Sequence, residues 1–356
     1  MLGGRIRGQG TYGCIFQPAL KCRGNKKKGN STNSVVGKIT SHRDAKNEIE
    51  IAKILSKIKN SSDYVVLSET NRCIPLTREK QDDPDIEQCE FLKTTELEDA
   101  YQIKMPWGGY PLSRINLDPY LFDYFRFVEE ILACGSFLVL NDLCHFDIWG
   151  NNFLFDKYNK PRIIDFGFTF QPSKLTIKDI SNRWRMLGVD HDTETPEVTL
   201  MLATHQNISV ERIIRGLEEQ KPAVLHLAAY CDVNPVHWGG ELYQWSLDST
   251  SFQQRDWLNC WKVYWPGFDA WSIGAMLLSV LEIQMGIPAF VKSNAWITKG
   301  ERVKKVLRGL CRAHPAYRLD AVEALNLLTD GKHPLVSSGS AGSDWISEKQ
   351  KTRPMN

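Results

Sequence analysis

Residues 145–152 read His-Phe-Asp-Ile-Trp-Gly-Asn-Asn, and residues 165–167 read Asp-Phe-Gly. In the first stretch, the Asp147 carboxylate can orient a hydroxyl group and accept its proton. Asn152 and Asp165 offer the hard oxygen ligands that Mg²⁺ prefers. Loop carboxylates without a catalytic role can produce either stretch alone. The two stretches in this order favour a catalytic site over that interpretation.

A glycine-rich segment near the N-terminus precedes these stretches. Gly8, Gly10 and Gly13 have the spacing Gly-x-Gly-x-x-Gly and run into Cys14-Ile15-Phe16, which has the pattern of a strand. A dinucleotide-binding fold places the same spacing between a strand and a helix, but no helical pattern follows here. The glycines are therefore predicted to join two strands, an arrangement in which backbone amides fold over phosphate groups.

Together these motifs resemble the eukaryotic-type protein kinase superfamily, and the resemblance covers residues 8–328. Lys38, on the strand pattern of residues 35–39, matches the family's third-strand lysine, although an exposed strand lysine is the alternative interpretation. The resemblance implies catalytic roles for Asp147, Lys38 and Asn152, and Mg²⁺ ligation by Asn152 and Asp165. It implies ATP binding by Gly8, Gly10, Gly13, Ile15, Lys38, Glu48, Met105, Trp107 and Gly108.

Later motifs extend the resemblance into the C-terminal half. Residues 195–197, Thr-Pro-Glu, resemble the family's A-P-E element, and residues 269–274 resemble the helix that anchors its catalytic loop. Residues 315–318 end in Arg318 and resemble the late arginine motif. In the family that arginine pairs with the A-P-E glutamate, so the resemblance implies a buried structural pair between Glu197 and Arg318.

The family also implies a glutamate partner for Lys38 on the following helix. Glu48 fits best, because Ile49, Ile51 and Leu55 then form the inward apolar face; Glu50 remains the second choice. Residues 105–108, Met-Pro-Trp-Gly, resemble a gatekeeper and hinge of the casein-kinase type, where backbone groups receive adenine. Met105 can equally be a core residue.

Three departures from the family pattern matter for function. Phe146 replaces the catalytic-loop arginine that receives a phosphorylated activation segment, so activation by phosphorylation there is not expected. Trp149 replaces the lysine that steadies the transferred phosphoryl group, so either another cation substitutes or turnover is slow. An insertion at about residues 198–262, rich in tryptophan, is expected to reshape the substrate face and offers a surface for a docking partner.

The chain of 356 residues is long enough for two lobes. We expect an α+β, bilobal protein kinase fold with a sheet-rich N-lobe at 1–106 and a mainly helical C-lobe at 107–335. The tail, 336–356, is low in apolar residues and is expected to be disordered.

Composition narrows the possible partners and compartments. The net charge of +2 does not point to nucleic acid, and no long apolar run points to a membrane. The nine scattered cysteines, without a Cys-x-x-Cys pair, predict reduced thiols in the cytoplasm. Residues 11–22 also resemble the opening of kinases encoded by large cytoplasmic DNA viruses, which implies synthesis in host cytoplasm and packaging in virions as a further location.

These observations predict an ATP- and Mg²⁺-dependent enzyme that phosphorylates serine or threonine in protein substrates. A small-molecule kinase of the aminoglycoside or choline type is the first alternative, because it also uses an H-x-D-x-x-x-x-N loop. The intact Asp165-Phe166-Gly167 motif and the Glu197–Arg318 match favour the protein kinase. A pseudokinase that binds ATP as a scaffold is the second alternative.

Overall fold

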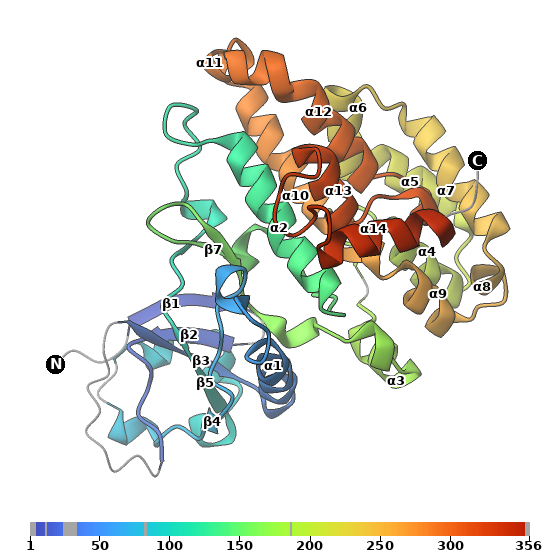
Figure 1. Ribbon diagram of the computed structural model, residues 1–356. Coiled ribbons are helices and arrows are strands. Elements are labelled where there is room, and N and C mark those ends of the chain that lie inside the picture. Colours follow the sequence, from blue (N-terminus) through green and yellow to red (C-terminus); the bar gives the residue numbers. More distant parts are fainter. Residues whose placement is uncertain (1–4, 11–12, 24–33, 82–83, 186, 353–356) are drawn as a thin grey trace. The chain divides into compact units, whose positions relative to one another are not determined.

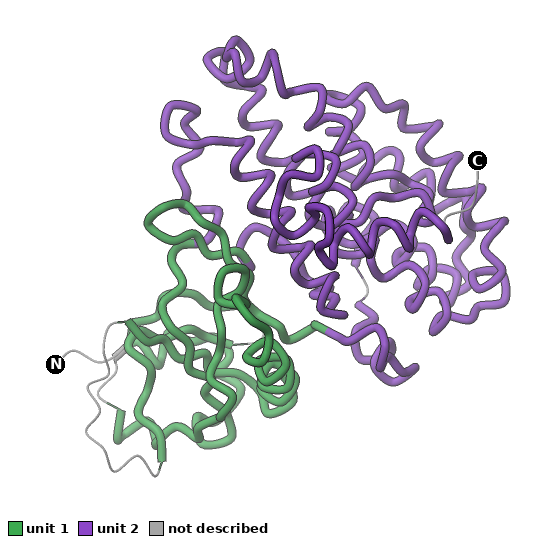
Figure 2. Tube along the Cα trace, in the orientation of Figure 1, with its two compact units in different colours: residues 1–110, 153–169 green, residues 111–152, 170–356 purple. Residues whose placement is uncertain are grey.

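The computed structural model describes residues 5–10, 13–23, 34–81, 84–185 and 187–352. The chain divides into two compact units, residues 1–110 with 153–169 and residues 111–152 with 170–356 (Figure 2). The first unit combines small antiparallel sheets with helix α1, and the second is larger and mainly helical (Figure 1). The predicted α+β class is therefore confirmed.

The main sheet of the first unit is antiparallel, with strand order β1-β2-β3-β5-β4. Its strands are β1 (Arg5–Gly10), β2 (Gly13–Gln17), β3 (Val35–Thr40), β4 (Arg72–Cys73) and β5 (Tyr101–Pro106). Gly10 pairs with Gly13, so the glycine segment joins two strands as predicted. Residues alternate between faces along β2, where Cys14 and Phe16 are buried. This register aligns Ile15 with Lys38 and Lys38 with Ile103.

Helix α1 (His42–Leu55) follows β3 directly. The Ser41 side chain caps its first turn by accepting a hydrogen bond from the Asp44 amide at 3.2 Å. Ile49 packs with Ala45 and with Ile103 of β5, so the apolar face of the helix lies against the sheet. Glu48 is buried on the same helix, whereas Glu50 is exposed.

The boundary between the units differs from the expected division at residue 106. The hairpin of β7 (Phe153–Phe155) and β8 (Pro161–Ile163), predicted within the larger lobe, belongs to the smaller unit. The reason is backbone pairing: the Val66 amide donates to the Ile163 carbonyl at 2.9 Å, and the Ile163 amide donates to the Tyr64 carbonyl at 2.9 Å. Asp165, just after β8, is thereby attached to the unit that carries Lys38.

Two disulfides lie in the smaller unit, so the expectation of reduced thiols is wrong for four cysteines. Cys14 of β2 is bonded to Cys89, and Cys22 is bonded to Cys73 of β4. The partners are 75 and 51 residues apart in the chain, and folding brings their Cα atoms within 6.0 and 5.7 Å. Disulfides form and persist in oxidising surroundings. The other five cysteines are unbonded and buried.

The larger unit is built around α2 (Tyr124–Leu140) and α10 (Pro266–Met285), whose side chains are mostly buried. The Tyr124 hydroxyl donates to the Leu277 carbonyl at 3.0 Å and ties these helices together. The flanking helices are α11 (Pro288–Val291), α12 (Asn294–Leu310) and α13 (Ala321–Thr329), and the short helix α3 (Ile177–Arg183) lies beside α9 (Trp257–Tyr264). Within the described ranges, no helix combines the length and apolar character needed to cross a membrane.

The insertion predicted at 198–262 is helical throughout most of its length. It comprises most of α4 (Pro196–His205), then α5 (Val210–Gln220), α6 (Pro222–Cys231), α7 (Pro235–Asp248), α8 (Thr250–Gln253) and most of α9 (Trp257–Tyr264). Its tryptophans form part of the core, since Trp238, Trp245 and Trp261 are buried. The insertion is thus an integral part of the larger unit.

The tail also differs from expectation, because residues 341–352 form helix α14 (Ala341–Thr352). The Trp345 Nε1 and Lys349 Nζ atoms donate to an Asp320 carboxylate oxygen at 2.8 and 2.7 Å, and Lys349 also pairs with Glu323. These polar anchors fix a segment whose apolar content is low, so the predicted disorder is wrong for 336–352. Residues 353–356 lie outside the described part of the chain.

Candidate functional site

Lys38 is the centre of the site residues in the smaller unit. Its ammonium nitrogen lies 2.7 Å from Oε2 of Glu48 and 2.6 Å from Oδ1 of Asp165. The lysine and Glu48 are buried, whereas 40% of the Asp165 side chain is exposed. Strand β3, helix α1 and the segment after β8 thus bring together three residues selected from the sequence, and Glu48 is the partner of Lys38 in place of Glu50.

The charges of this triad favour a protonated lysine. Burial alone lowers the pKa of Lys38, but the carboxylates of Asp165 and Glu48 outweigh it and raise the pKa above its ordinary value. Lys38 therefore carries a fixed positive charge at neutral pH. Such a charge can hold an anionic oxygen brought close to it.

Asn47 organises the Asp165-Phe166-Gly167 segment, and sequence reasoning missed it. Its Nδ2 donates to the carbonyls of Phe166, Gly167 and Thr169 at 3.1, 2.7 and 3.2 Å. Asp165 has a left-handed backbone, with φ of 64°, and its carboxylate accepts from the Gly167 amide. No sequence pattern distinguishes this asparagine, because only the fold brings it to the segment.

An apolar surface lies beside this triad in the same unit. Met105 is buried with Val36 and Val66, and the half-buried side chains that pack against them are Ile15, Trp107, Leu154 and Ile164. Three of the expected nucleotide-contacting residues, Ile15, Met105 and Trp107, therefore converge. A flat apolar surface of this kind can take the face of a heteroaromatic ring.

The backbone of residues 107 and 108 is engaged in hydrogen bonds. The Trp107 amide donates to the Ser34 carbonyl at 2.7 Å, and the Gly108 carbonyl accepts from Arg162 Nη2 at 3.0 Å. A Cβ atom at Gly108 would lie 2.7 Å from side-chain carbons of both Leu154 and Val66. Glycine at 108 thus permits close packing of the hinge on the apolar surface.

The three glycine positions near the N-terminus differ in whether the structure leaves room for a side chain. At Gly13, φ is +155° and a Cβ atom would lie 2.0 Å from the Ile39 carbonyl oxygen, so a side chain is excluded. At Gly8 and Gly10 a Cβ atom would meet no described atom within 4 Å. Glycine at these two positions leaves the backbone of β1 exposed to an approaching ligand.

In the larger unit, Asp147 and Asn152 lie within hydrogen-bond distance of each other. The Asn152 Nδ2 donates to the Asp147 carbonyl at 2.8 Å and to its carboxylate Oδ2 at 3.1 Å. This orientation turns the amide oxygen of Asn152 away from Asp147, since the two amide atoms lie on opposite sides of one planar group. The residues just before Asp147 are held by Asp269 of α10, whose carboxylate accepts from the His145 and Phe146 amides at 2.6 and 2.8 Å.

Phe146 lies in an aromatic cluster of the larger unit. Its ring centroid lies 4.6 Å from that of Trp261 and 5.8 Å from those of Phe170 and Phe268. Trp261 comes from the insertion, and Phe170 follows the Asp-Phe-Gly segment. The Trp261 ring therefore packs against the start of the segment that follows residue 169.

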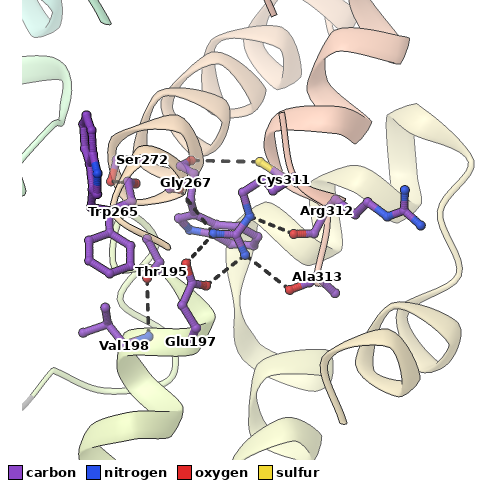
Figure 3. A network of polar contacts seen from close by, with 12 residues as sticks. Thr195, Glu197, Val198, Trp265, Gly267, Ser272, Cys311, Arg312 and Ala313 are labelled. Carbon is purple, nitrogen blue, oxygen red and sulfur yellow. Dashed lines mark hydrogen bonds and ion pairs between the residues drawn. The ribbon is translucent and has the colours of Figure 1, made fainter. Parts of the chain in front are cut away.

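The implied pair of Glu197 and Arg318 is confirmed, and both side chains are fully buried. Arg318 Nη1 lies 2.7 Å from Oε1 and Nη2 lies 2.9 Å from Oε2 of the glutamate, a bidentate arrangement. The remaining donors reach the carbonyls of Arg312, Ala313 and Gly267. Figure 3 shows Glu197 on its helix facing this network, with Gly267, Arg312 and Ala313 around it.

The donor chemistry of the site fits a magnesium ion. Asp165 offers a partly exposed carboxylate, and Asn152 offers an amide oxygen turned away from Asp147. These residues belong to different units, each described by itself. Within the described residues, no cluster of three or more His, Cys, Asp or Glu side chains is arranged to hold a metal. Oxygen donors of this kind bind Mg²⁺ together with phosphate oxygens and water.

The sequence matches none of the protein-family models or curated proteins with which it was compared.

Proposed function

We propose that this chain is a protein kinase that transfers the γ-phosphoryl group of ATP to serine or threonine hydroxyls, with Mg²⁺ as cofactor. The observation that carries the proposal is the convergence of Glu48 and Asp165 on Lys38, although Asp165 is 127 residues from Lys38 in the chain. A buried ammonium held between two carboxylates is suited to bind a phosphate oxygen beside a metal ion.

In the proposed reaction, the acceptor hydroxyl oxygen forms a bond to the γ-phosphorus of ATP. The bond between that phosphorus and the β,γ-bridging oxygen breaks, and ADP leaves with the electron pair. Asp147 accepts the hydroxyl proton, and Asn152 holds its carboxylate in place. Lys38 holds a nucleotide phosphate oxygen, and Mg²⁺, when bound, neutralises charge on the phosphates. The apolar surface of Ile15, Met105 and Trp107 receives the adenine ring.

Two features of the larger unit support a protein substrate over a small molecule. The buried Glu197–Arg318 pair fixes the start of α4. The segment before it is also fixed, because the Trp271 Nε1 and Ser272 Oγ atoms donate to the carbonyls of Asp192 and Thr193 at 2.9 and 2.6 Å. An ordered backbone at this point of the chain provides a surface against which an extended peptide can lie.

The decisive experiment incubates purified full-length protein with labelled ATP and Mg²⁺. Casein, a basic protein, the chain itself, choline and an aminoglycoside serve as acceptors, and phosphoamino-acid analysis follows. We expect phosphoserine or phosphothreonine in a protein acceptor. If only choline or the aminoglycoside acquires labelled phosphate, the protein is a small-molecule kinase. ATP binding by calorimetry without any transfer would show the pseudokinase.

Variants test the assigned roles within this proposal. Asp165→Asn is expected to abolish Mg²⁺-dependent transfer, because an amide holds the ion far less well than a carboxylate. Asp147→Asn is expected to lower kcat while ATP affinity stays nearly unchanged. Asp190→Asn, in an exposed loop of the larger unit, is the matched control and should behave as wild type. Wild-type turnover of Asp165→Asn would refute the mechanism.

A further inference from the structure

The catalytic loop lacks a cation at the position where the kinase pattern has one. Trp149 stands two residues after Asp147, and 44% of its surface is exposed. Phosphoryl transfer spreads negative charge over the oxygens of the moving group, so a site that performs it needs a compensating positive charge. A cation beside Asp147 in the larger unit could supply this charge.

Arg185, far from the catalytic loop in sequence, meets this requirement. Its Nη1 lies 2.9 Å from Oδ1 of Asp147, and its Nη2 donates to the Phe146 carbonyl at 3.1 Å. About a quarter of each side chain in this ion pair is exposed. The Arg185 side chain is therefore partly open to solvent and partly sheltered by the protein.

The chain around Arg185 holds it in this position. Helix α3 begins with a capping box, in which Thr176 and Asp179 satisfy each other's backbone amides. Trp184, the residue before Arg185, stacks on His205 of α4 at 5.0 Å and meets Trp257 of α9 edge-on at 6.1 Å. The insertion helices thus fix the backbone from which Arg185 extends.

Little empty space surrounds the pair on its inner side. A cavity of only about 10 Å³, room for roughly one water molecule, is lined by Asp147, Arg185 and Glu194. The two carboxylate oxygens of Asp147 are divided between two partners, Oδ1 with Arg185 and Oδ2 with Asn152.

We propose that Arg185 supplies the positive charge that Trp149 cannot, and stabilises the phosphoryl group as it passes to the acceptor hydroxyl beside Asp147. This inference rests on the proposed kinase function. The guanidinium offers several N–H donors in a planar fork, so it can keep its bond to Asp147 while another N–H meets a phosphoryl oxygen. The bonds that form and break, and the transfer of the hydroxyl proton to Asp147, are those given for the proposed reaction.

The test compares Arg185→Ala, Arg185→Gln and Arg185→Lys with wild type in the phosphoryl-transfer assay, using the best protein acceptor. We expect kcat to fall about 10²–10³-fold for the alanine and glutamine variants, with the KM for ATP changed less than about twofold. The lysine variant should keep part of the rate as a point charge. Lys178→Ala, an exposed cation on the same segment, is the control and should be unchanged.

Chemical rescue tests whether Arg185 acts through its positive charge or only by positioning Asp147. Guanidinium ion added at millimolar concentration should restore part of the kcat of Arg185→Ala and none for Asp147→Asn. Thermal unfolding and calorimetric ATP binding, both close to wild type, would show that the variants are folded. A kcat of Arg185→Ala equal to wild type would overturn the inference. A higher kcat would overturn it too, and would show that Arg185 masks Asp147.

The assay separates failure of this inference from failure of the proposed function. If wild type transfers phosphate but loss of Arg185 has no effect, only the role of Arg185 is refuted. If wild type transfers no phosphate to any acceptor, the kinase proposal itself is refuted and the role of Arg185 is refuted with it.

Discussion

Glu197 and Arg318 illustrate how much one buried residue pair can matter to stability. Neither side chain has any exposed surface, so each charge depends on the other for compensation. Taking two charges out of water is unfavourable, and the bidentate geometry with added carbonyl acceptors offsets it. Removing one partner leaves the other charge buried without its counter-charge.

We predict that Arg318→Ala lowers the free energy of unfolding by about 3–5 kcal/mol, because Glu197 would be left buried and unpaired. Urea denaturation followed by circular dichroism measures this difference. Arg312→Ala is the matched control, since Arg312 is partly exposed and pairs with Glu241. It should lower stability by less than about 1 kcal/mol. Equal losses for the two variants would contradict the structural role of the pair.

The family resemblance implied this pair and a glutamate partner for Lys38, but it gave no sign of two other side chains that organise the candidate site. The spacing of Ile49, Ile51 and Leu55 identified the inner face of α1 and hence Glu48. Asn47 and Arg185 were missed, because a neutral amide and a loop arginine carry no periodic signal. Their roles arise only from contacts made across the fold.

At the scale of elements, the insertion helices hold the segment that precedes α4. Lys221, at the junction of α5 and α6, is fully buried, and its Nζ donates to the His191 carbonyl at 2.7 Å. The Asp192 carboxylate in turn accepts from the Ala223 amide in the first turn of α6 at 2.7 Å. These contacts attach residues 191–192 to the junction of α5 and α6.

We predict that Lys221 makes the free energy of unfolding rise with pH in the alkaline range. Burial lowers the pKa of Lys221 to about 8 despite the nearby carboxylates of Glu194 and Asp192, whereas the unfolded chain keeps its ordinary value. At a pH between these two pKa values, Lys221 is protonated more often in the unfolded chain than in the folded chain. The free energy of unfolding therefore rises with pH. From pH 7.5 to 9.5 the contribution is about 2 kcal/mol.

Urea denaturation of wild type and Lys221→Met at several pH values checks this prediction. The difference between the two curves should grow with pH in favour of wild type, because methionine has no proton to release. Lys178→Met, at an exposed position of α3, should follow wild type throughout. Parallel profiles for wild type and Lys221→Met would exclude a lowered pKa for this lysine.

The C-terminal tail shows why composition alone can mispredict an element. Composition indicated disorder for 336–356, because few apolar residues are present there. The structure instead holds α14 through Trp345 and Lys349, which bind the carboxylate that also caps α13. A polar anchor of this kind contributes nothing to a count of hydrophobic residues, so only tertiary contacts reveal it.

At the scale of the whole molecule, cysteine pairing was the least predictable feature. The number of cysteines, nine, and their short spacings do not reveal disulfide partners that are 75 and 51 residues apart in the chain. Strand order brings them together, and strand order was not predicted. The same limitation explains the misplaced unit boundary, because the pairing of residues 64–66 with Ile163 is also long-range.

We predict that alkylation in denaturant without reductant modifies five cysteines, Cys134, Cys144, Cys231, Cys260 and Cys311. After reduction all nine should react. Peptide mapping by mass spectrometry reads out both numbers, and Cys14→Ser should make Cys89 reactive without reductant as an internal control. Nine modified residues in unreduced protein would show that the disulfides do not form.

The smaller unit is made of two separate stretches of chain, and this has a consequence for the order of events during synthesis on the ribosome. Residues 1–110 emerge well before residues 153–169, and Lys38 precedes Asp165 by 127 positions. At elongation rates of about 5–20 residues per second, roughly 6–25 seconds pass between these two residues. Strand β5, which pairs with the strand of Lys38, is complete at residue 106, so only in the later part of that interval can the nascent sheet form around the lysine, and Asp165 has then not yet been made. The larger unit grows from both sides of the late stretch, so neither unit can be completed before the other has begun.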